Sequence, residues 1–160
     1  MTKTVVLGIG NTLLSDEGVG VHVIEALEKA FLLPPDVEVI DGGTCAMEML
    51  EQLENLDLLV VVDCVRSGSP PATHVVIKGD AVPVFFKTKL SPHQIGLSDV
   101  LASLEFTGRA PKATVIVGIE PASMALGMEP TPAVAARIPD LVDLTVGELR
   151  AHGLHIEARA

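Results

Sequence analysis

Residues 58–63 read Leu-Leu-Val-Val-Val-Asp, five consecutive apolar residues that end on a carboxylate. An unbroken apolar run of this kind is typical of a central strand in a parallel sheet, buried on both faces. Similar runs over Thr4–Ile9 and residues 115–118 predict further strands of the same sheet. In open α/β sheets ligands bind beyond the carboxyl ends of the strands, so Asp63 lies where a functional site is expected.

Helical patterns alternate with these strand candidates along the whole chain. Helices are predicted over residues 18–31, Ala46–Leu53, Pro92–Phe106 and 131–152, and further strands over residues 37–40 and 74–77. Ser91 and Pro92 suit the N-cap and the first position of the third helix. The alternation predicts an α/β domain of three layers with a mostly parallel sheet. Residues 79–90 form the longest predicted irregular segment, a feature often tied to function.

Composition supports one globular domain over residues 1–160 and argues against several classes of function. The chain is 48% hydrophobic and 20% charged, which fits a single core and disfavours disorder. Its net charge of −10 disfavours binding to nucleic acid or to anionic membranes. No apolar run approaches the roughly 18 residues that span a bilayer. Neither a signal peptide nor a disulfide between Cys45 and Cys64 is indicated, so we expect a cytoplasmic protein.

A glycine-rich turn follows the first predicted strand and opens the first helix. It reads Gly8-Ile9-Gly10-Asn11-Thr12-Leu13-Leu14-Ser15-Asp16-Glu17-Gly18-Val19-Gly20. Dinucleotide-binding turns have a similar setting, but Leu13 replaces their third glycine, and no Gly-Lys-Ser/Thr of a P-loop follows. The turn ends on Asp16 and Glu17. These carboxylates either favour the helix dipole or supply a ligand, and their spacing leaves both readings open.

Asp63 and His93 are two further candidates for a site. A turn-forming Asp is common after a strand, and a lone His at a helix start is usually exposed or capping. We expect His93 to be exposed, to project towards the strand ends, and to be kept neutral by the helix dipole. Together with a carboxylate of the first turn, the two make a mixed oxygen and nitrogen set that suits Zn, Ni, Fe or Mn better than Ca or Mg. Cys64 is expected to point away from Asp63, as a small buried residue.

The ordered set of motifs resembles the nickel–iron hydrogenase maturation proteases. After the glycine-rich opening come Asp41-Gly42-Gly43-Thr44, Val62-Asp63, Ser91-Pro92-His93-Gln94-Ile95-Gly96-Leu97-Ser98-Asp99, Phe106-Thr107-Gly108 and Val117-Gly118-Ile119-Glu120-Pro121. The similarity covers nearly the whole chain at matching spacings. It implies an α/β/α sandwich whose twisted five-stranded sheet is mostly parallel, with one antiparallel edge strand that we assign to residues 74–77. The Ser-Pro-His-Gln motif is most similar to the branch that serves uptake hydrogenases.

The resemblance also implies a function and a metal. Family members are endopeptidases that remove a C-terminal extension from the precursor of the hydrogenase large subunit, once nickel has been installed. Their metal ligands map to Glu17, Asp63 and His93, with Glu17 preferred to Asp16 because it directly precedes Gly18-Val19-Gly20. Nickel would arrive with the precursor, and the metal or a carboxylate would polarise the carbonyl or activate water. Two alternatives stay open: the three residues only recognise nickel, or the protein is a nickel-checking chaperone that does not cut.

Overall fold

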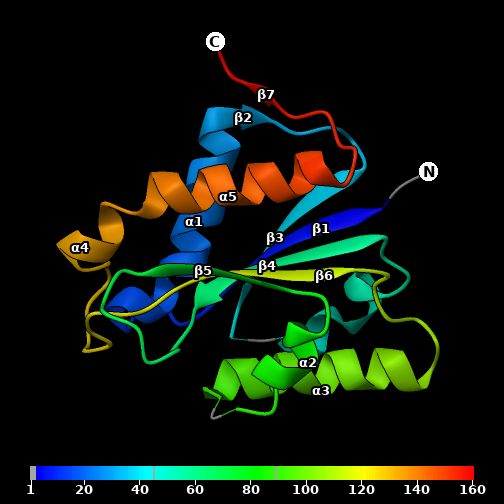
Figure 1. Ribbon diagram of the computed structural model, residues 1–160, viewed down its shortest axis with the longest axis horizontal. Coiled ribbons are helices and arrows are strands. Elements are labelled where there is room, and N and C mark those ends of the chain that lie inside the picture. Colours follow the sequence, from blue (N-terminus) through cyan, green and yellow to red (C-terminus); the bar gives the residue numbers. More distant parts are fainter. Residues whose placement is uncertain (1–2, 45, 89) are drawn as a thin grey trace.

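A computed structural model describes residues 3–44, 46–88 and 90–160, and it shows a twisted sheet between two layers of helices (Figure 1). The sheet has five strands in the order β3-β1-β4-β6-β5. Their bounds are Thr4–Ile9 for β1, Val37–Gly43 for β3, Leu58–Cys64 for β4, His74–Lys78 for β5 and Thr114–Ile119 for β6. The first four strands of this order pair in parallel, and β5 pairs antiparallel with β6 at the edge. The predicted sandwich and its antiparallel edge strand are confirmed.

Helices cover both faces of this sheet (Figure 1). One layer holds η1 (Ser15–Gly18), α1 (Val19–Ala30), α4 (Pro132–Ala135) and α5 (Ile138–Ala151). The other holds η2 (Ala46–Leu53), α2 (Ala81–Phe85) and α3 (Pro92–Phe106). A separate two-stranded antiparallel sheet joins β2 (Phe31–Leu32) to β7 (Glu157–Ala158). Strands of two residues carry no readable periodicity, which is why this small sheet was not predicted.

Alternation along β4 divides the core into two halves. Leu58, Val60 and Val62 pack with residues of α1 and α5 in one buried cluster. Leu59 and Val61, one residue out of phase, pack with residues of η2 and α3 in the other. Every residue of β4 is buried, as expected for a central parallel strand. The same alternation sends Cys64 to the α1 and α5 side, which confirms that it points away from Asp63.

Several predicted boundaries were wrong, each for a physical reason. The predicted helix over residues 131–152 is two helices, α4 and α5, because Pro139 has no N–H to donate and lies in the first turn of a new helix that begins at Ile138. The strand predicted over residues 37–40 continues to Gly43, where Gly43 pairs with Ile9 past a β-bulge. The segment predicted to be irregular over residues 79–90 contains the short helix α2.

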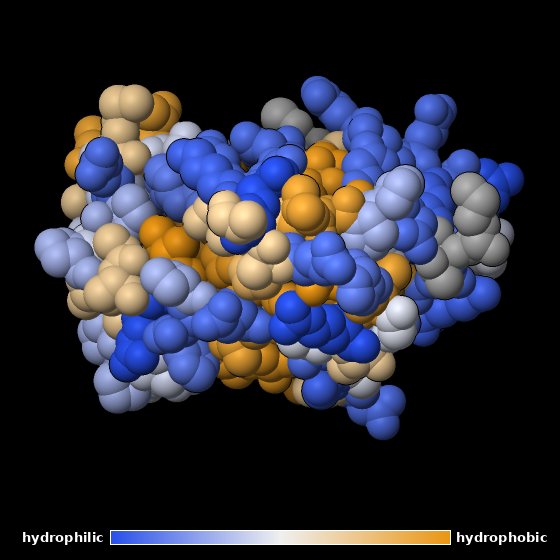
Figure 2. Space-filling model, turned by 90° about the horizontal axis from the view of Figure 1, so that it is seen from above, coloured by the Kyte–Doolittle hydropathy of each residue, from blue (hydrophilic) through white to orange (hydrophobic). Residues whose placement is uncertain are grey.

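The surface over the upper helical layer is chemically mixed. Figure 2 looks down on this face, where small hydrophobic patches are interspersed with hydrophilic side chains. Among the helices of the described residues, none combines the length and the apolar character needed to cross a membrane.

Candidate functional site

Close packing of the glycine-rich turn brings Glu17 to the carboxyl ends of the central strands. A Cβ atom on Gly20 would collide with the carbonyl oxygen of Val62, so α1 can lie this close to β4 only with glycine there. Gly10 has a φ of 132°, and a Cβ there would meet the carbonyl oxygen of Glu17. These glycines therefore serve chain packing, rather than the approach of a dinucleotide to the turn.

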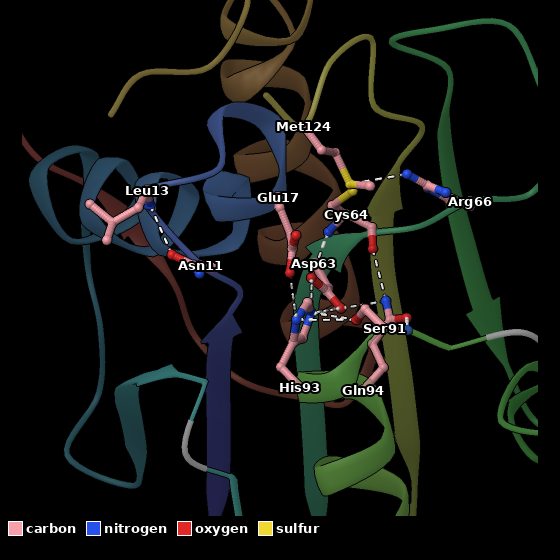
Figure 3. A network of polar contacts seen from close by, with 10 residues as sticks. All are labelled: Asn11, Leu13, Glu17, Asp63, Cys64, Arg66, Ser91, His93, Gln94 and Met124. Carbon is pink, nitrogen blue, oxygen red and sulfur yellow. Dashed lines mark hydrogen bonds and ion pairs between the residues drawn. The ribbon is translucent and has the colours of Figure 1, made fainter. Parts of the chain in front are cut away.

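Glu17, Asp63 and His93 meet in one cluster, although they come from η1, β4 and α3 (Figure 3). Nδ1 of His93 lies 3.0 Å from Oε1 of Glu17. Nε2 of His93 lies 3.0 Å from Oδ2 of Asp63 and 3.1 Å from its Oδ1. The structure thus brings together the three residues that the sequence singled out. The expectation that His93 is exposed was wrong: only 4% of the residue is accessible, because the start of α3 packs onto the end of β4.

Gln94 connects the first turn of α3 to the end of β4. Its Nε2 donates to Oδ2 of Asp63 at 2.7 Å and to the carbonyl oxygen of Cys64 at 2.9 Å. Its Oε1 accepts from the backbone N–H of Ser91, the reciprocal bond of a capping box. Sequence reasoning quoted Gln94 within a motif but gave it no role. Its place three residues after the N-cap Ser91 was the available signal.

The two carboxylates and burial act in opposite directions on the pKa of His93. Burial alone would lower the pKa of His93, but the hydrogen bond and charge of Asp63, together with Glu17, outweigh it and raise that pKa above its usual value. Burial also raises the pKa of Asp63, against the opposing effects of His93 and Gln94. The helix dipole was expected to keep His93 neutral. The raised pKa is opposite to the shift that the dipole alone would cause, because two carboxylates at contact distance act more strongly than a partial charge.

In this arrangement Glu17, Asp63 and His93 contact one another. Within the described part of the chain, no group of three or more His, Cys, Asp or Glu side chains is placed to hold a metal ion. The reason is visible in the cluster, since both ring nitrogens of His93 already contact carboxylates. The residue types still suit a divalent transition metal. A metal that used all three side chains would have to replace the contacts that His93 makes to Glu17 and Asp63.

Asp16 has a different task from its neighbour Glu17. It is fully buried and accepts hydrogen bonds from the backbone N–H groups of Ala122, Ser123 and Thr131 at 2.7–3.0 Å. The hydroxyl of Thr131 also donates to it, at 2.9 Å from Oδ2. Asp16 therefore anchors the segment that follows β6. The simple helix-dipole reading of both carboxylates does not account for these contacts.

A cavity of about 470 Å³ opens beside the cluster. Its lining includes Glu17, Cys64, Arg66, His93 and Met124. Nη2 of Arg66 lies 3.7 Å from the sulfur of Met124, a weak contact (Figure 3). Burial raises the pKa of the Cys64 thiol, which disfavours the thiolate that a cysteine nucleophile needs. Cys45 lies outside the described residues.

A larger hollow, of about 720 Å³, lies between α2, α3 and the amino end of β6. None of Glu17, Asp63 and His93 lines it. We therefore take the smaller cavity as the candidate active site, because buried titratable groups line it at the carboxyl ends of parallel strands.

Known proteins are similar to this chain in both sequence and fold. A model of the hydrogenase maturation protease family matches residues 21–148. The hydrogenase 2 maturation protease of Escherichia coli (strain K12) is 42% identical over 153 residues, which cover 95% of this chain and 93% of that protein. The hydrogenase expression/formation protein HupD of Rhodobacter capsulatus is 38% identical over 156 residues, covering 96% of this chain and 74% of HupD.

Solved structures give the same answer. The hydrogenase maturating endopeptidase HybD from Escherichia coli superposes with a TM-score of 0.95 at 41% identity, covering 99% of this chain and 98% of HybD. The similarity therefore holds in sequence as well as in fold, and it covers nearly the whole of both chains. The chain therefore belongs to the hydrogenase maturation protease family, and it is an endopeptidase.

Proposed function

We propose that this endopeptidase removes a C-terminal extension from the precursor of a nickel–iron hydrogenase large subunit, and that it recognises the nickel that the precursor carries. The single observation behind the proposal is the meeting of Glu17, Asp63 and His93, each within 3.0 Å of a neighbour, beside an open cavity. Two carboxylates and one imidazole are too few to complete a metal site alone. Such a set suits a metal whose other ligands come from the substrate.

The charges in the cluster support this role. Asp63 and Glu17 are both buried, and they share His93 as a partner. A divalent cation delivered by the precursor would compensate the charge of both carboxylates. His93 would then bind through a neutral nitrogen, as metal-binding histidines do. The closed cluster is thus the resting arrangement, and docking of the precursor exchanges its internal contacts for contacts to the metal.

Gln94 keeps Asp63 in place during this exchange. It would still hold Oδ2 of Asp63 after His93 turns away, because its hydrogen bonds to Asp63 and Cys64 do not involve the ring. Oδ1 of Asp63 accepts from the N–H of Cys64 at 2.7 Å. The Asp63 carboxylate is therefore fixed from two directions. Bound metal would supply the Lewis acid that polarises the scissile carbonyl or activates water.

A cleavage assay tests the proposal and separates it from the chaperone alternative. Purified protein is mixed with nickel-loaded precursor or with the same precursor prepared without nickel, and the products are weighed by mass spectrometry. We expect release of a C-terminal peptide from the nickel-loaded precursor alone. Binding of the loaded precursor without any cut would favour the chaperone. Equal cleavage of both precursors would reject recognition of nickel.

Metal analysis of the freshly purified protein tests where the metal resides. We expect little bound metal, and affinities for added divalent ions that place copper and nickel above manganese. One tightly held zinc per chain, combined with cleavage of nickel-free precursor, would indicate an ordinary zinc peptidase instead.

We also propose that processing takes place in the cytoplasm. The described cysteine, Cys64, is buried and free, which suits a reducing compartment. Cell fractionation followed by immunoblotting checks this, and recovery of the protein with an extracytoplasmic fraction would contradict it.

A further inference from the structure

Arg66 differs from the other arginines of the chain in what its guanidinium contacts. The others donate to carboxylate or carbonyl oxygens at 2.7–3.1 Å, namely Arg109, Arg137, Arg150 and Arg159. Within the described residues, the guanidinium of Arg66 reaches no oxygen acceptor, and its contact is with the sulfur of Met124 at 3.7 Å. A guanidinium carries five N–H donors, and a thioether sulfur is a weak acceptor. Most of the donors of Arg66 are therefore available to a ligand.

These donors belong to the cavity of about 470 Å³ beside the reactive cluster. Among the described residues that line it, Arg66 is the only lysine or arginine, whereas Glu17 contributes a carboxylate. Figure 3 shows Arg66 directed toward Met124, which lines the same cavity. Arg66 is exposed, and a guanidinium is weakly hydrated for a cation. It can therefore exchange water for an acceptor at low cost when a substrate enters.

The backbone that follows Arg66 is fixed to the end of β6. The N–H groups of Ser67 and Gly68 donate to the carboxylate of Glu120 at 2.8 and 3.2 Å. Glu120 is buried, and these two bonds engage its carboxylate with the backbone instead of with the guanidinium. Because the backbone is already held, binding of a ligand by Arg66 has only a side chain to order, which lowers the entropic cost.

We propose that Arg66 binds a backbone carbonyl oxygen of the precursor segment that enters this cavity, and so positions the precursor for cleavage. The inference rests on the proposed function, because it takes this cavity as the place where the precursor is cut. Ionised carboxylates only accept hydrogen bonds, so Glu17 and Asp63 cannot hold a carbonyl oxygen. Arg66 supplies the donors that these two side chains lack.

A carbonyl acceptor makes no demand on the side chains of the precursor. The substrate of an endopeptidase is a peptide, and each of its residues carries one carbonyl oxygen. An extended peptide advances by about 3.3 Å per residue, so more than one carbonyl falls within a cavity of this size. Arg150 and Arg159 already donate to backbone carbonyl oxygens inside this protein. The precursor would offer Arg66 the same kind of partner.

Replacement of Arg66 with a matched arginine control tests the inference. The test variant is Arg66→Ala, and the control is Arg109→Ala, which removes an exposed arginine beyond the other end of α3 from His93. Cleavage of nickel-loaded precursor is measured over a range of precursor concentrations, at low and at high salt. Titration of the loaded precursor gives its affinity in parallel, and thermal unfolding confirms that both variants fold.

We expect Arg66→Ala to raise KM by about tenfold and to leave kcat within about twofold, as for a lost hydrogen bond from a charged donor. Millimolar guanidinium chloride should lower the KM of Arg66→Ala, whereas the same concentration of sodium chloride should not. The tenfold ratio should persist at high salt, because the acceptor is a neutral carbonyl and not a screened charge. Arg109→Ala should keep KM within about twofold of wild type and show no response to guanidinium.

An unchanged KM in folded Arg66→Ala, an equal rise in Arg109→Ala, or no rescue by guanidinium would overturn the inference. A ratio that collapses at high salt would also overturn it, since the acceptor would then be an acidic side chain of the precursor. Wild-type protein that binds the loaded precursor without cutting it would reject the proposed function instead. The affinities from titration would then decide whether Arg66 holds the precursor, by the same ratio and the same rescue.

Discussion

Gln94 donates a hydrogen bond from Nε2 to Oδ2 of Asp63 at 2.7 Å, joining the first turn of α3 to the last residues of β4. The same Nε2 reaches the carbonyl oxygen of Cys64. The position of the Asp63 carboxylate is therefore set by the contact between α3 and β4, and not by a flexible loop. Sites supported in this way keep their geometry when a substrate binds.

Replacing Gln94 by leucine should uncouple that contact. Asp63 and the Cys64 carbonyl would each lose a buried donor, which costs about 1–3 kcal/mol of unfolding free energy. Cleavage of the precursor should slow as well, because Asp63 is no longer held. Gln52→Leu, at an exposed position of η2, is the control and should change stability by no more than about 0.5 kcal/mol. Denaturant unfolding and the cleavage assay measure both effects. Equal behaviour of the two variants would contradict this role for Gln94.

Asp16→Asn should mainly lower stability, whereas Glu17→Gln should mainly slow cleavage. An amide at position 16 would place N–H groups against the N–H groups of Ala122, Ser123 and Thr131, and the cost is about 3 kcal/mol of stability. Glu17 contacts His93 and lines the cavity, so Glu17→Gln should cost less stability but slow cleavage at least about tenfold, since the charge on a metal ligand is lost. Thermal unfolding and cleavage rates separate the two effects. Similar small effects of both changes would support a simple interaction with the helix dipole.

His93→Ala should abolish processing while leaving a folded protein. Because His93 is buried, some loss of stability is also expected: the carboxylates of Asp63 and Glu17 would lose their shared partner. His155→Ala, at an exposed position in the C-terminal segment, is the matched control and should process normally. Circular dichroism confirms folding, and precursor cleavage is scored by mass. A folded His93→Ala protein that processes the precursor at the wild-type rate would remove His93 from the mechanism.

Two glycine substitutions should change stability in opposite directions. Gly20→Ala would drive a methyl group into the carbonyl oxygen of Val62, so we expect a loss of at least about 2 kcal/mol and a displaced α1. Gly147 lies in α5 with no atom near the position of a Cβ. Gly147→Ala should therefore stabilise the helix by about 0.5–1 kcal/mol. Melting temperatures of the two variants check both signs, and a stabilising Gly20→Ala would contradict the packing described for α1.

Local sequence signals predicted the elements on which the site depends. The strand Thr4–Ile9 and the helix Pro92–Phe106 were predicted with the bounds that the structure has. Ser91 and Pro92 fix the start of that helix, because they form an N-cap and a first helical residue. Asp63 could be placed at the end of a buried strand because the unbroken apolar run before it is typical of a central parallel strand.

The features of the site that the sequence did not predict depend on contacts between residues far apart in the chain. Asp16 and Glu17 are adjacent and chemically alike, yet Asp16 binds Thr131, 115 residues further along, while Glu17 turns to His93. The chemistry of the two residues does not distinguish these fates, and only the family motif favoured Glu17 as the ligand. Burial of His93 likewise depends on how α3 packs against β4, and its raised pKa follows from partners that only the fold assembles.

Nickel X-ray absorption of the complex tests the central claim most directly. Nickel-loaded precursor is frozen alone, with wild-type protein, and with the folded His93→Ala variant, and the ligands around nickel are compared. We predict that wild-type protein adds nitrogen and oxygen neighbours, including the scattering pattern of an imidazole, and that His93→Ala removes the imidazole contribution. A nickel environment that wild-type protein leaves unchanged would contradict direct recognition of the metal by Glu17, Asp63 and His93.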